Sequence, residues 1–348
     1  MRHRYIGRSG LRVSPICMGT MTFGATADKK ESFKIMDKAY DAGINFYDTA
    51  ELYPVPPDTK WMGQTESIVG EWLQTKPRDS VILATKVAGA ASGWFVPPNR
   101  HGLTAIDRFH IEKACEDSLR RLKIDYIDLY QLHWPERNTN TFGVRNYKHN
   151  RDDTGKDNFN DILHTLDGII KEGKIRHVGI SNEKAWGTMR YLEESKKHNL
   201  PRMISIQNAY SLLNRVFEGD MAEIAMRENI KLLAYSPMAF GVLSGKYIKG
   251  TAAENARLKL FPRFARYSSE QSTEATKAYL TLAEDNDMSL AQMSLAFVTQ
   301  QPFVLANIIG ATTLEQLEEN IDSINVELSK ELLAKINAIH TRIPNPAP

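Results

Sequence analysis

The stretch GINFYDTAELYP, residues 43–54, contains the structural unit from which the fold of this chain can be predicted. Its apolar, β-prone residues, among them Phe46 and Tyr47, predict a short buried strand. That strand ends on the carboxylate of Asp48, and a phenol, Tyr53, stands five residues later. A buried strand that ends in polar residues between helical stretches is one β/α unit, and the same order recurs along the chain.

Short apolar runs of this kind alternate with longer amphipathic runs. The predicted strands cover residues 15–20, 44–49, 80–86, 126–133, 176–181, 203–208, 231–236 and 304–310. The predicted helices cover residues 29–43, 65–74, 108–125, 161–174, 184–198, 219–230, a long region of about 270–300, 313–324 and 330–340. Alternating strands and helices require parallel strands. Eight repeats favour an α/β fold of the (β/α)8 TIM-barrel type over an open doubly wound sheet.

The chain is expected to form one domain over residues 1–348. No G-x-G-x-x-G motif follows a predicted strand, which disfavours a Rossmann domain, and the sequence contains neither a linker nor a repeat. The irregular stretches 88–107, 134–160 and 237–268 are long for connections. They predict functional loops at the C-terminal face of the barrel.

The composition is that of an ordinary globular protein, with 42% hydrophobic and 25% charged residues in a chain of 348. A net charge of +2 gives no reason to expect nucleic acid or a membrane surface as a partner. Cys17 and Cys115 lack metal-type spacing, so we expect no metal and a reducing, cytoplasmic location. Residues 1–19 lack the apolar run of a signal peptide, and no run of residues predicts a membrane span.

Polar residues follow the predicted strands at the points where catalytic groups of a barrel are found. Three adjacent strands end on Asp48, Lys86 and His133, and Tyr53 lies on the neighbouring loop. The later strands end on Ser181, Asn182, Gln207, Asn208, Tyr235 and Ser236. Taken singly, each ionisable residue has a structural interpretation as a capped turn, a solvated strand end or a loop anchor. Their conjunction favours a proton-transfer site.

These segments resemble the signatures of a known family. GINFYDTAELYP, together with LATK (83–86) and LYQLHWP (129–135), is similar to the catalytic segments of the aldo-keto reductases. The segments that resemble the cofactor-binding parts of the same family are VGISN (178–182), IQNAYSLLNR (206–215), LLAYSPMAFGVLSGKY (232–247) and IIGATTLEQLEEN (308–320). The resemblance covers nearly the whole chain and implies a TIM barrel that reduces carbonyl compounds.

The resemblance implies that Tyr53 donates a proton to a carbonyl oxygen, that Asp48 and Lys86 tune it, and that His133 orients the carbonyl. The chemistry of these groups is coherent with such roles. A free phenol has a pKa of about 10 and is a poor acid at neutral pH. A neighbouring Lys86 ammonium lowers that pKa toward the working pH, and Asp48 keeps the buried amine protonated. We therefore predict a lowered pKa for Tyr53.

The same resemblance implies NADPH as the hydride donor across the barrel mouth. Tyr235 would stack on the nicotinamide, while Ser181, Asn182 and Gln207 bind its carboxamide. The remaining cofactor contacts that it implies are Thr20, Asp48, Ser236, Pro237, Met238, Ala239, Lys246, Arg257, Gly310, Thr312, Gln316, Glu319 and Asn320. Lys246 and Arg257 are the cations expected to bind phosphates.

Selectivity for NADPH over NADH depends on residues 310–320. Many family members place a basic pair here, where this chain has Gly310 and Gln316, so use of NADH stays open. The potassium-channel β subunits, more distant relatives, also lack that pair. Thr312 and Gln316 fit their pattern of a hydroxyl and an amide.

A small aldehyde or ketone is the implied substrate. Trp94, Phe95 and Trp134 stand in the long loops and could line an aromatic pocket, with loop packing as the alternative interpretation. Two other functions stay open: a slow-turnover NADPH sensor or scaffold subunit like the channel subunits, and a barrel isomerase or aldolase with Lys86 as a Schiff base. The aldolase reading would leave the predicted nicotinamide site unexplained. The sequence leaves the oligomeric state open.

Overall fold

The computed structural model describes residues 1–92, 97, 100–149, 157–262 and 265–348. Within these ranges eight parallel strands close into a barrel, in the order β10, β11, β12, β3, β4, β5, β8 and β9. The barrel strands are β3 (Ile16–Gly19), β4 (Phe46–Asp48), β5 (Ile82–Val87), β8 (Ile127–Leu132), β9 (Ile175–Ser181), β10 (Met203–Ala209), β11 (Leu232–Tyr235) and β12 (Val304–Ile309). Each falls on a strand predicted from the sequence, so the predicted (β/α)8 barrel is confirmed.

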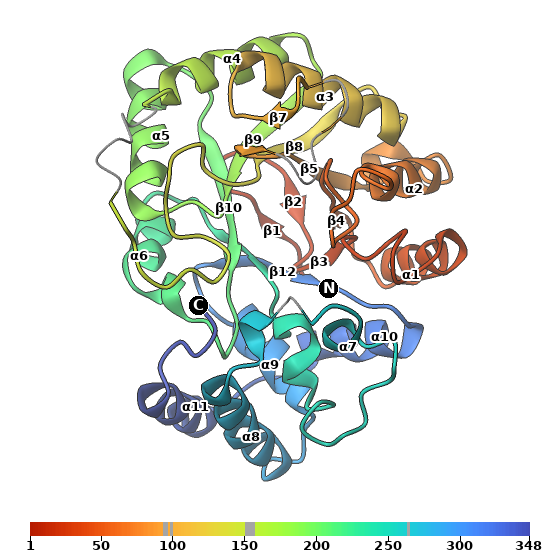
Figure 1. Ribbon diagram of the computed structural model, residues 1–348, viewed down its shortest axis with the longest axis vertical. Helices are drawn as coiled ribbons and strands as arrows, with labels where there is room; N and C mark the ends of the chain where they lie inside the picture. Colours follow the sequence, from red (N-terminus) through yellow and green to blue (C-terminus); the bar gives the residue numbers. More distant parts are fainter. Residues whose placement is uncertain (93–96, 98–99, 150–156, 263–264) are drawn as a thin grey trace.

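Helices surround the barrel (Figure 1). They are α1 (Lys29–Asp41), α2 (Gln64–Leu73), α3 (Arg108–Leu122), α4 (Phe159–Lys171), α5 (Ala185–His198), α6 (Asp220–Arg227), α7 (Arg257–Leu260), α8 (Glu270–Glu284), α9 (Leu290–Thr299), α10 (Leu314–Asp322) and α11 (Lys330–Arg342). Short 3-10 helices are η1 (Arg78–Ser80), η2 (Val216–Glu218), η3 (Ala239–Ser244), η4 (Ala265–Tyr267) and η5 (Ser323–Asn325). Among the described residues, no helix combines the length and apolar character needed to cross a membrane.

Two helices, α8 and α9, occupy the helical region predicted at about 270–300. Asp287 between them has a φ of 53°, in the left-handed region, where a right-handed helix cannot continue. The Ser289 side chain then accepts a hydrogen bond from the Gln292 backbone N–H and begins α9.

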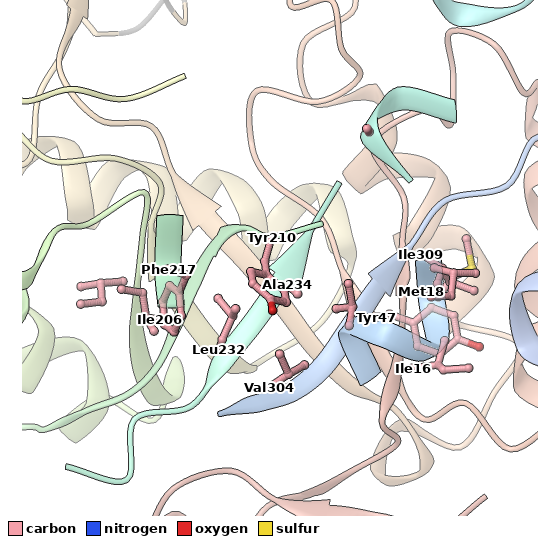
Figure 2. Packing of buried hydrophobic residues seen from close by; sticks show 14 of the residues in the cluster. Ile16, Met18, Tyr47, Ile206, Tyr210, Phe217, Leu232, Ala234, Val304 and Ile309 are labelled. Atoms are coloured by element: carbon pink, nitrogen blue, oxygen red, sulfur yellow. The ribbon is translucent and has the colours of Figure 1, made fainter. Parts of the chain in front are cut away.

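Side chains of successive strand residues point alternately into the barrel and out toward the helices. The inward apolar set consists of Cys17, Phe46, Ile82, Ala84, Leu129, Ile204, Leu233, Leu305, Ala306 and Ile308. Two consecutive residues, Leu305 and Ala306, belong to it because the pairing of β12 with β11 shifts register at this point. The outward set packs with the helices in a larger cluster. Part of this outer layer, including Tyr47, Leu232 and Val304, is seen in Figure 2. The alternation decides which polar residues can reach the barrel mouth.

Short antiparallel hairpins that the sequence did not predict complete the fold. They pair β1 (Arg4–Tyr5) with β2 (Arg12–Val13), and β6 (Ala91–Ser92) with β7 (Leu103–Thr104). Ile6 and Val13, at the first hairpin, pack against the inward apolar set and close the N-terminal end of the barrel. Strands of two residues are too short to give a periodic signal in the sequence.

Candidate active site

The inward-facing positions turn from apolar to polar toward the C-terminal end of the strands. On β8, Leu129 belongs to the inward apolar set, and Gln131 and His133 follow on the same face at steps of two residues. On β5, Lys86 follows Ala84 in the same way. The polar side chains therefore cap the apolar interior at the barrel mouth.

Asp48 is the centre of a buried hydrogen-bond network. Its Oδ2 lies 2.6 Å from Lys86 Nζ, and its Oδ1 accepts from Gln131 Nε2 at 3.1 Å and Gln207 Nε2 at 2.8 Å. Lys86 Nζ also donates to the Thr49 carbonyl at 2.8 Å. Lys86 is 0% and Asp48 is 2% exposed. A buried charge pair is stable only when its remaining hydrogen-bonding groups are satisfied, and these neighbours satisfy them.

The pKa of Lys86 is raised above its ordinary value. Burial by itself acts in the opposite direction and favours the neutral amine, but the charges of Asp48 and Tyr53 outweigh it. The prediction that Asp48 keeps Lys86 protonated agrees with this direction.

Tyr53 lies beside Lys86 and His133 at the mouth. Lys86 Nζ is 5.0 Å from the centroid of the Tyr53 ring, and the Tyr53 and His133 ring centroids are 5.8 Å apart at 78°. The predicted lowering of the Tyr53 pKa is wrong in its net direction. Burial raises the pKa of Tyr53, and Lys86 offsets only part of that rise because Asp48 acts against it. Tyr53 is therefore a protonated phenol at neutral pH.

His133 is a neutral imidazole at neutral pH. Burial, assisted by the Lys86 charge, lowers the pKa of His133 well below its ordinary value. Among the described residues its Nδ1 has no hydrogen-bond partner, although the atom is buried. An imidazole held in this way can donate one ring N–H to a ligand without carrying a charge.

A second network lies next to the first. Tyr235 Oη donates to Asn182 Oδ1 at 2.6 Å, and Asn182 Nδ2 donates to the His133 carbonyl at 2.8 Å and to Ser181 Oγ at 3.2 Å. Ser181 Oγ donates to the Gln207 carbonyl at 2.8 Å. The predicted carboxamide-binding residues are thus brought together. Gln207 uses both amide hydrogens inside the barrel, which leaves its side-chain carbonyl oxygen to accept from a ligand.

The turn after β11 is conformationally unusual. Ser236, Ala239 and Phe240 have φ values of 54°, 46° and 56°, which residues other than glycine rarely adopt. Lys246 lies beside this turn, with its Nζ 3.1 Å from where a Cβ on Gly241 would stand. Burial lowers the pKa of Lys246, and no carboxylate among the described residues forms an ion pair with it. A strained turn beside a partly desolvated cation suits an anion such as a phosphate.

The segment between β12 and α10 presents polar groups at a helix N-terminus. The Thr312 backbone N–H and hydroxyl both donate to Gln316 Oε1 at 3.1 Å, and the Gln316 residue is exposed. Asn320 Nδ2 donates to the Gly310 carbonyl at 3.1 Å. The Glu319 carboxylate accepts from a serine hydroxyl at 2.6 Å, so it already has one partner.

Arg257 of α7 lies near Tyr53. Its guanidinium carbon lies 4.1 Å from the centre of the Phe240 ring, and its Nη2 lies 3.8 Å from Met21 Sδ. Burial lowers the pKa of Arg257 to about 10, against a raising effect of Tyr53. The side chain remains a cation at neutral pH.

Trp134 forms an aromatic wall at the mouth. Its ring centroid lies 5.1 Å from that of His133 and 5.8 Å from that of Phe142. Its Nε1 donates to the Ala90 carbonyl at 3.1 Å. A Cβ on Gly89 would stand 2.3 Å from the Trp134 ring, so the indole needs a glycine at that position. Trp94 and Phe95, predicted for the same pocket, lie outside the described residues.

Thr20, also predicted as a cofactor contact, donates through Oγ1 to the Asp48 carbonyl at 2.9 Å and lies at the mouth. Sequence reasoning missed three buried polar residues, Gln131, Glu51 and Arg100. A signal for Gln131 existed, because it lies two residues from His133 on a predicted strand. Among the described residues, no group of three or more metal-binding side chains could hold a metal ion.

Comparison with known proteins gives a match over residues 15–341 to the Aldo/keto reductase family. The chain belongs to this family. Aldo/keto reductases are NAD(P)H-dependent oxidoreductases that act on small carbonyl compounds, and an oxidoreductase activity of this general kind follows for the present chain.

Several relatives match the chain over nearly its whole length. Protein tas of Escherichia coli (strain K12) is 46% identical over 355 aligned residues, which cover 100% of both chains. The oxidoreductase YrpG of Bacillus subtilis (strain 168) is 33% identical over 97% of this chain and 96% of its own. A probable voltage-gated potassium channel subunit beta of Oryza sativa subsp. japonica is 30% identical over 97% and 96% of the two chains.

The neutral state of His133 predicts how the stability of this aldo/keto reductase depends on pH. Since the unfolded chain binds a proton at His133 below about pH 6.5 and the folded chain does not, stability falls as pH falls below that value. When the pH is lowered from about 7 to about 5, the unfolding free energy of the wild type should fall by up to about 2 kcal/mol more than that of His133→Gln.

Urea unfolding curves at a series of pH values measure this difference. His164→Gln, at an exposed position of α4, is the control and should keep the wild-type pH dependence. If the unfolding free energies of wild type and His133→Gln change equally with pH, the pKa of His133 is the same in the folded and the unfolded chain, which contradicts the prediction.

Proposed function

We propose that this chain reduces aldehydes or ketones to alcohols with NADPH, and that Tyr53 donates the proton. The observation that supports this most is the convergence of a buried Asp48–Lys86 ion pair, a phenol and a neutral imidazole at one barrel mouth. We propose further that residues 1–348 act as one aldo-keto reductase domain in the cytoplasm, where Cys17 and Cys115 stay reduced.

Tyr53 is suited to be an acid in this direction of reaction. Its raised pKa keeps the phenol protonated across the neutral range, so the proton is present when a substrate binds. As negative charge develops on the carbonyl oxygen, the phenol transfers its proton there and becomes a phenolate. Lys86 beside the ring stabilises that phenolate, and Asp48 keeps Lys86 charged.

His133 supplies a neutral hydrogen-bond donor to the same oxygen. Because its imidazole carries no charge at neutral pH, it orients and polarises the carbonyl while Tyr53 provides the proton. Trp134 and Phe142 form one side of the substrate pocket.

NADPH fits the residues that surround Tyr235, and when bound it supplies the hydride. Tyr235 offers an aromatic face, while Ser181, Asn182 and Gln207 offer amide and hydroxyl groups for a carboxamide. Residues 236–239 and Lys246 bind the pyrophosphate. At the far end Gly310, Thr312, Gln316, Glu319 and Asn320 hold the adenosine with its 2′-phosphate.

A slow-turnover NADPH-binding subunit is the second candidate. The 30% identity to the rice protein named a probable voltage-gated potassium channel subunit beta favours it. Turnover of less than about one aldehyde per minute, with tight NADPH binding, would select this function. An aldolase-type Schiff base is disfavoured, because Lys86 is protonated and paired with Asp48, and an amine must be free and neutral to attack a carbonyl.

Tyr53→Phe tests the proton donor. Removing the phenolic hydroxyl should lower carbonyl reduction by roughly 10²–10⁴-fold and leave NADPH affinity unchanged, since general acid catalysis contributes about that much. Carbonyl reduction is measured by the fall in NADPH absorbance with a panel of aldehydes. NADPH affinity is measured by fluorescence titration.

Tyr47→Phe is the matched control for this substitution. Tyr47 is buried one residue before Asp48, but its hydroxyl faces the helices and donates to the Met36 carbonyl. Its variant should keep wild-type turnover. Full activity of Tyr53→Phe on a good substrate would remove Tyr53 as the acid.

The two loop cations should differ in their effect on cofactor choice. If Arg257 contacts the 2′-phosphate, Arg257→Ala should weaken NADPH binding by roughly 1.5–3 kcal/mol, the scale for a hydrogen bond to a charged group, and NADH binding much less. Lys246→Ala should weaken both dinucleotides about equally, because both carry the pyrophosphate. Dissociation constants of both dinucleotides decide the assignment.

Lys249→Ala is the control for these cations, since Lys249 lies on the same loop and pairs with Glu284 at the surface. It should leave both affinities unchanged. Equal losses of NADPH and NADH affinity in Arg257→Ala would make Arg257 a pyrophosphate ligand and remove it from the selectivity.

A further inference from the structure

A second buried ion pair joins the loop of residues 49–53, which carries Tyr53, to Arg100. Glu51 Oε1 accepts from Arg100 Nη1 at 3.1 Å, and Glu51 Oε2 accepts from Arg100 Nη2. Arg100 is 0% and Glu51 is 1% exposed, so both charges are removed from water. The two parallel bonds form the bidentate arrangement that fixes an arginine and a carboxylate in one relative orientation.

Glu51 joins the tyrosine loop to the strand that carries Lys86. Its backbone N–H donates to the Lys86 carbonyl at 3.2 Å, and its Oε1 accepts from the Ala88 backbone N–H at 2.6 Å. The Tyr53 backbone N–H donates to the Ala50 carbonyl at 3.1 Å, so Tyr53 is held in the turn that contains Glu51. The position of the phenol relative to the ammonium therefore depends on Glu51.

Arg100 links Glu51 to the described residues 100–104 and, through them, to Gly89. Its backbone carbonyl accepts from the Leu103 N–H at 3.1 Å at the entry to β7. Thr104 Oγ1 then donates to the Gly89 carbonyl at 2.6 Å. Trp134 packs against Gly89, so one guanidinium connects the tyrosine loop with the aromatic wall of the substrate pocket.

Stability alone does not explain two charges at this place. Burying an ion pair costs several kcal/mol per ion in desolvation, and well-packed apolar residues of similar size often give equal or greater stability. The ion pair fixes the relative orientation of the two side chains, which apolar residues would not do. A guanidinium group binds a carboxylate with two hydrogen bonds only over a narrow range of positions.

We propose that Glu51 and Arg100 are positioning residues, which hold residues 49–53 and the described residues 88–92 and 100–107 in register with Lys86. This role rests on the proposed carbonyl reduction. Neither residue touches the reacting atoms. Both act through the backbone that places Tyr53, and a displacement of the reacting groups by about 1 Å can lower a rate by roughly 10²-fold.

Arg100→Met tests the proposal, with Arg78→Met as the matched control. Arg78 also uses an Nη atom to bind a buried carboxylate, Asp128, at 2.6 Å, but it lies near the N-terminal start of β5 and β8, away from the mouth. Both variants are compared with wild type for kcat per NADPH-binding molecule, for NADPH dissociation constant, and for amide hydrogen exchange of residues 49–53 and of Ala88.

We expect Arg100→Met to lower kcat by about 10–10²-fold with less than about a threefold change in NADPH affinity. Exchange at the Glu51, Tyr53 and Ala88 amides should rise at least about tenfold. Arg78→Met should lose stability but keep kcat and these exchange rates. If Arg100→Met does not fold, Arg100→Lys replaces it. A lysine keeps the charge but not the fork, so the same pattern should appear at about 3–10-fold in kcat.

Wild-type kcat and exchange rates in the arginine variants would overturn the proposal, as would equal effects in Arg78→Met. The exchange readout does not depend on turnover. If wild type lacks carbonyl reduction but Arg100→Met still loosens residues 49–53, the proposed function fails and the positioning role stands. If Tyr53→Phe abolishes turnover while Arg100→Met keeps both readouts at wild-type values, only the positioning role fails.

Discussion

The ion pair between Asp48 and Lys86 is the interaction on which the rest of the site depends. It places two opposite charges at the mouth end of a barrel whose deeper inward surface is apolar, and such a pair persists only if its other hydrogen-bonding groups find partners. Gln131, Gln207 and the Thr49 carbonyl are those partners, and each comes from a strand or strand end that points at the same spot. The barrel geometry thus serves to converge side chains from strands far apart in sequence.

Burial and charge act on the neighbouring groups in opposite directions. Burial keeps Tyr53 protonated and His133 neutral, while the Lys86 charge acts to lower the pKa of Tyr53. In the proposed reaction, Tyr53 therefore holds its proton until the carbonyl binds, and the Lys86 ammonium stabilises the phenolate afterward. The Glu51–Arg100 ion pair holds the loop of residues 49–53, which carries Tyr53, without touching the reacting atoms.

The barrel could be predicted because each strand is a run of apolar residues in the sequence. The ionisable residues at the mouth could be predicted because polar residues follow directly after those runs. It missed what depends on distance through space. Glu51 and Arg100 are 49 positions apart, and no local pattern links them. Gln131 could have been found by following alternate residues back from His133. The pKa of Tyr53 was mispredicted in sign, because a charge partner can be guessed from spacing but the depth of burial cannot.

A double-mutant cycle on Asp48 and Lys86 tests the central claim most directly. Asp48→Asn and Lys86→Met should each lower the unfolding free energy by about 3–5 kcal/mol, since each leaves one buried charge without its partner. The double variant should lose much less than the sum, yet carbonyl reduction should not return. Additive losses of stability would contradict the account, and so would a double variant that regains turnover.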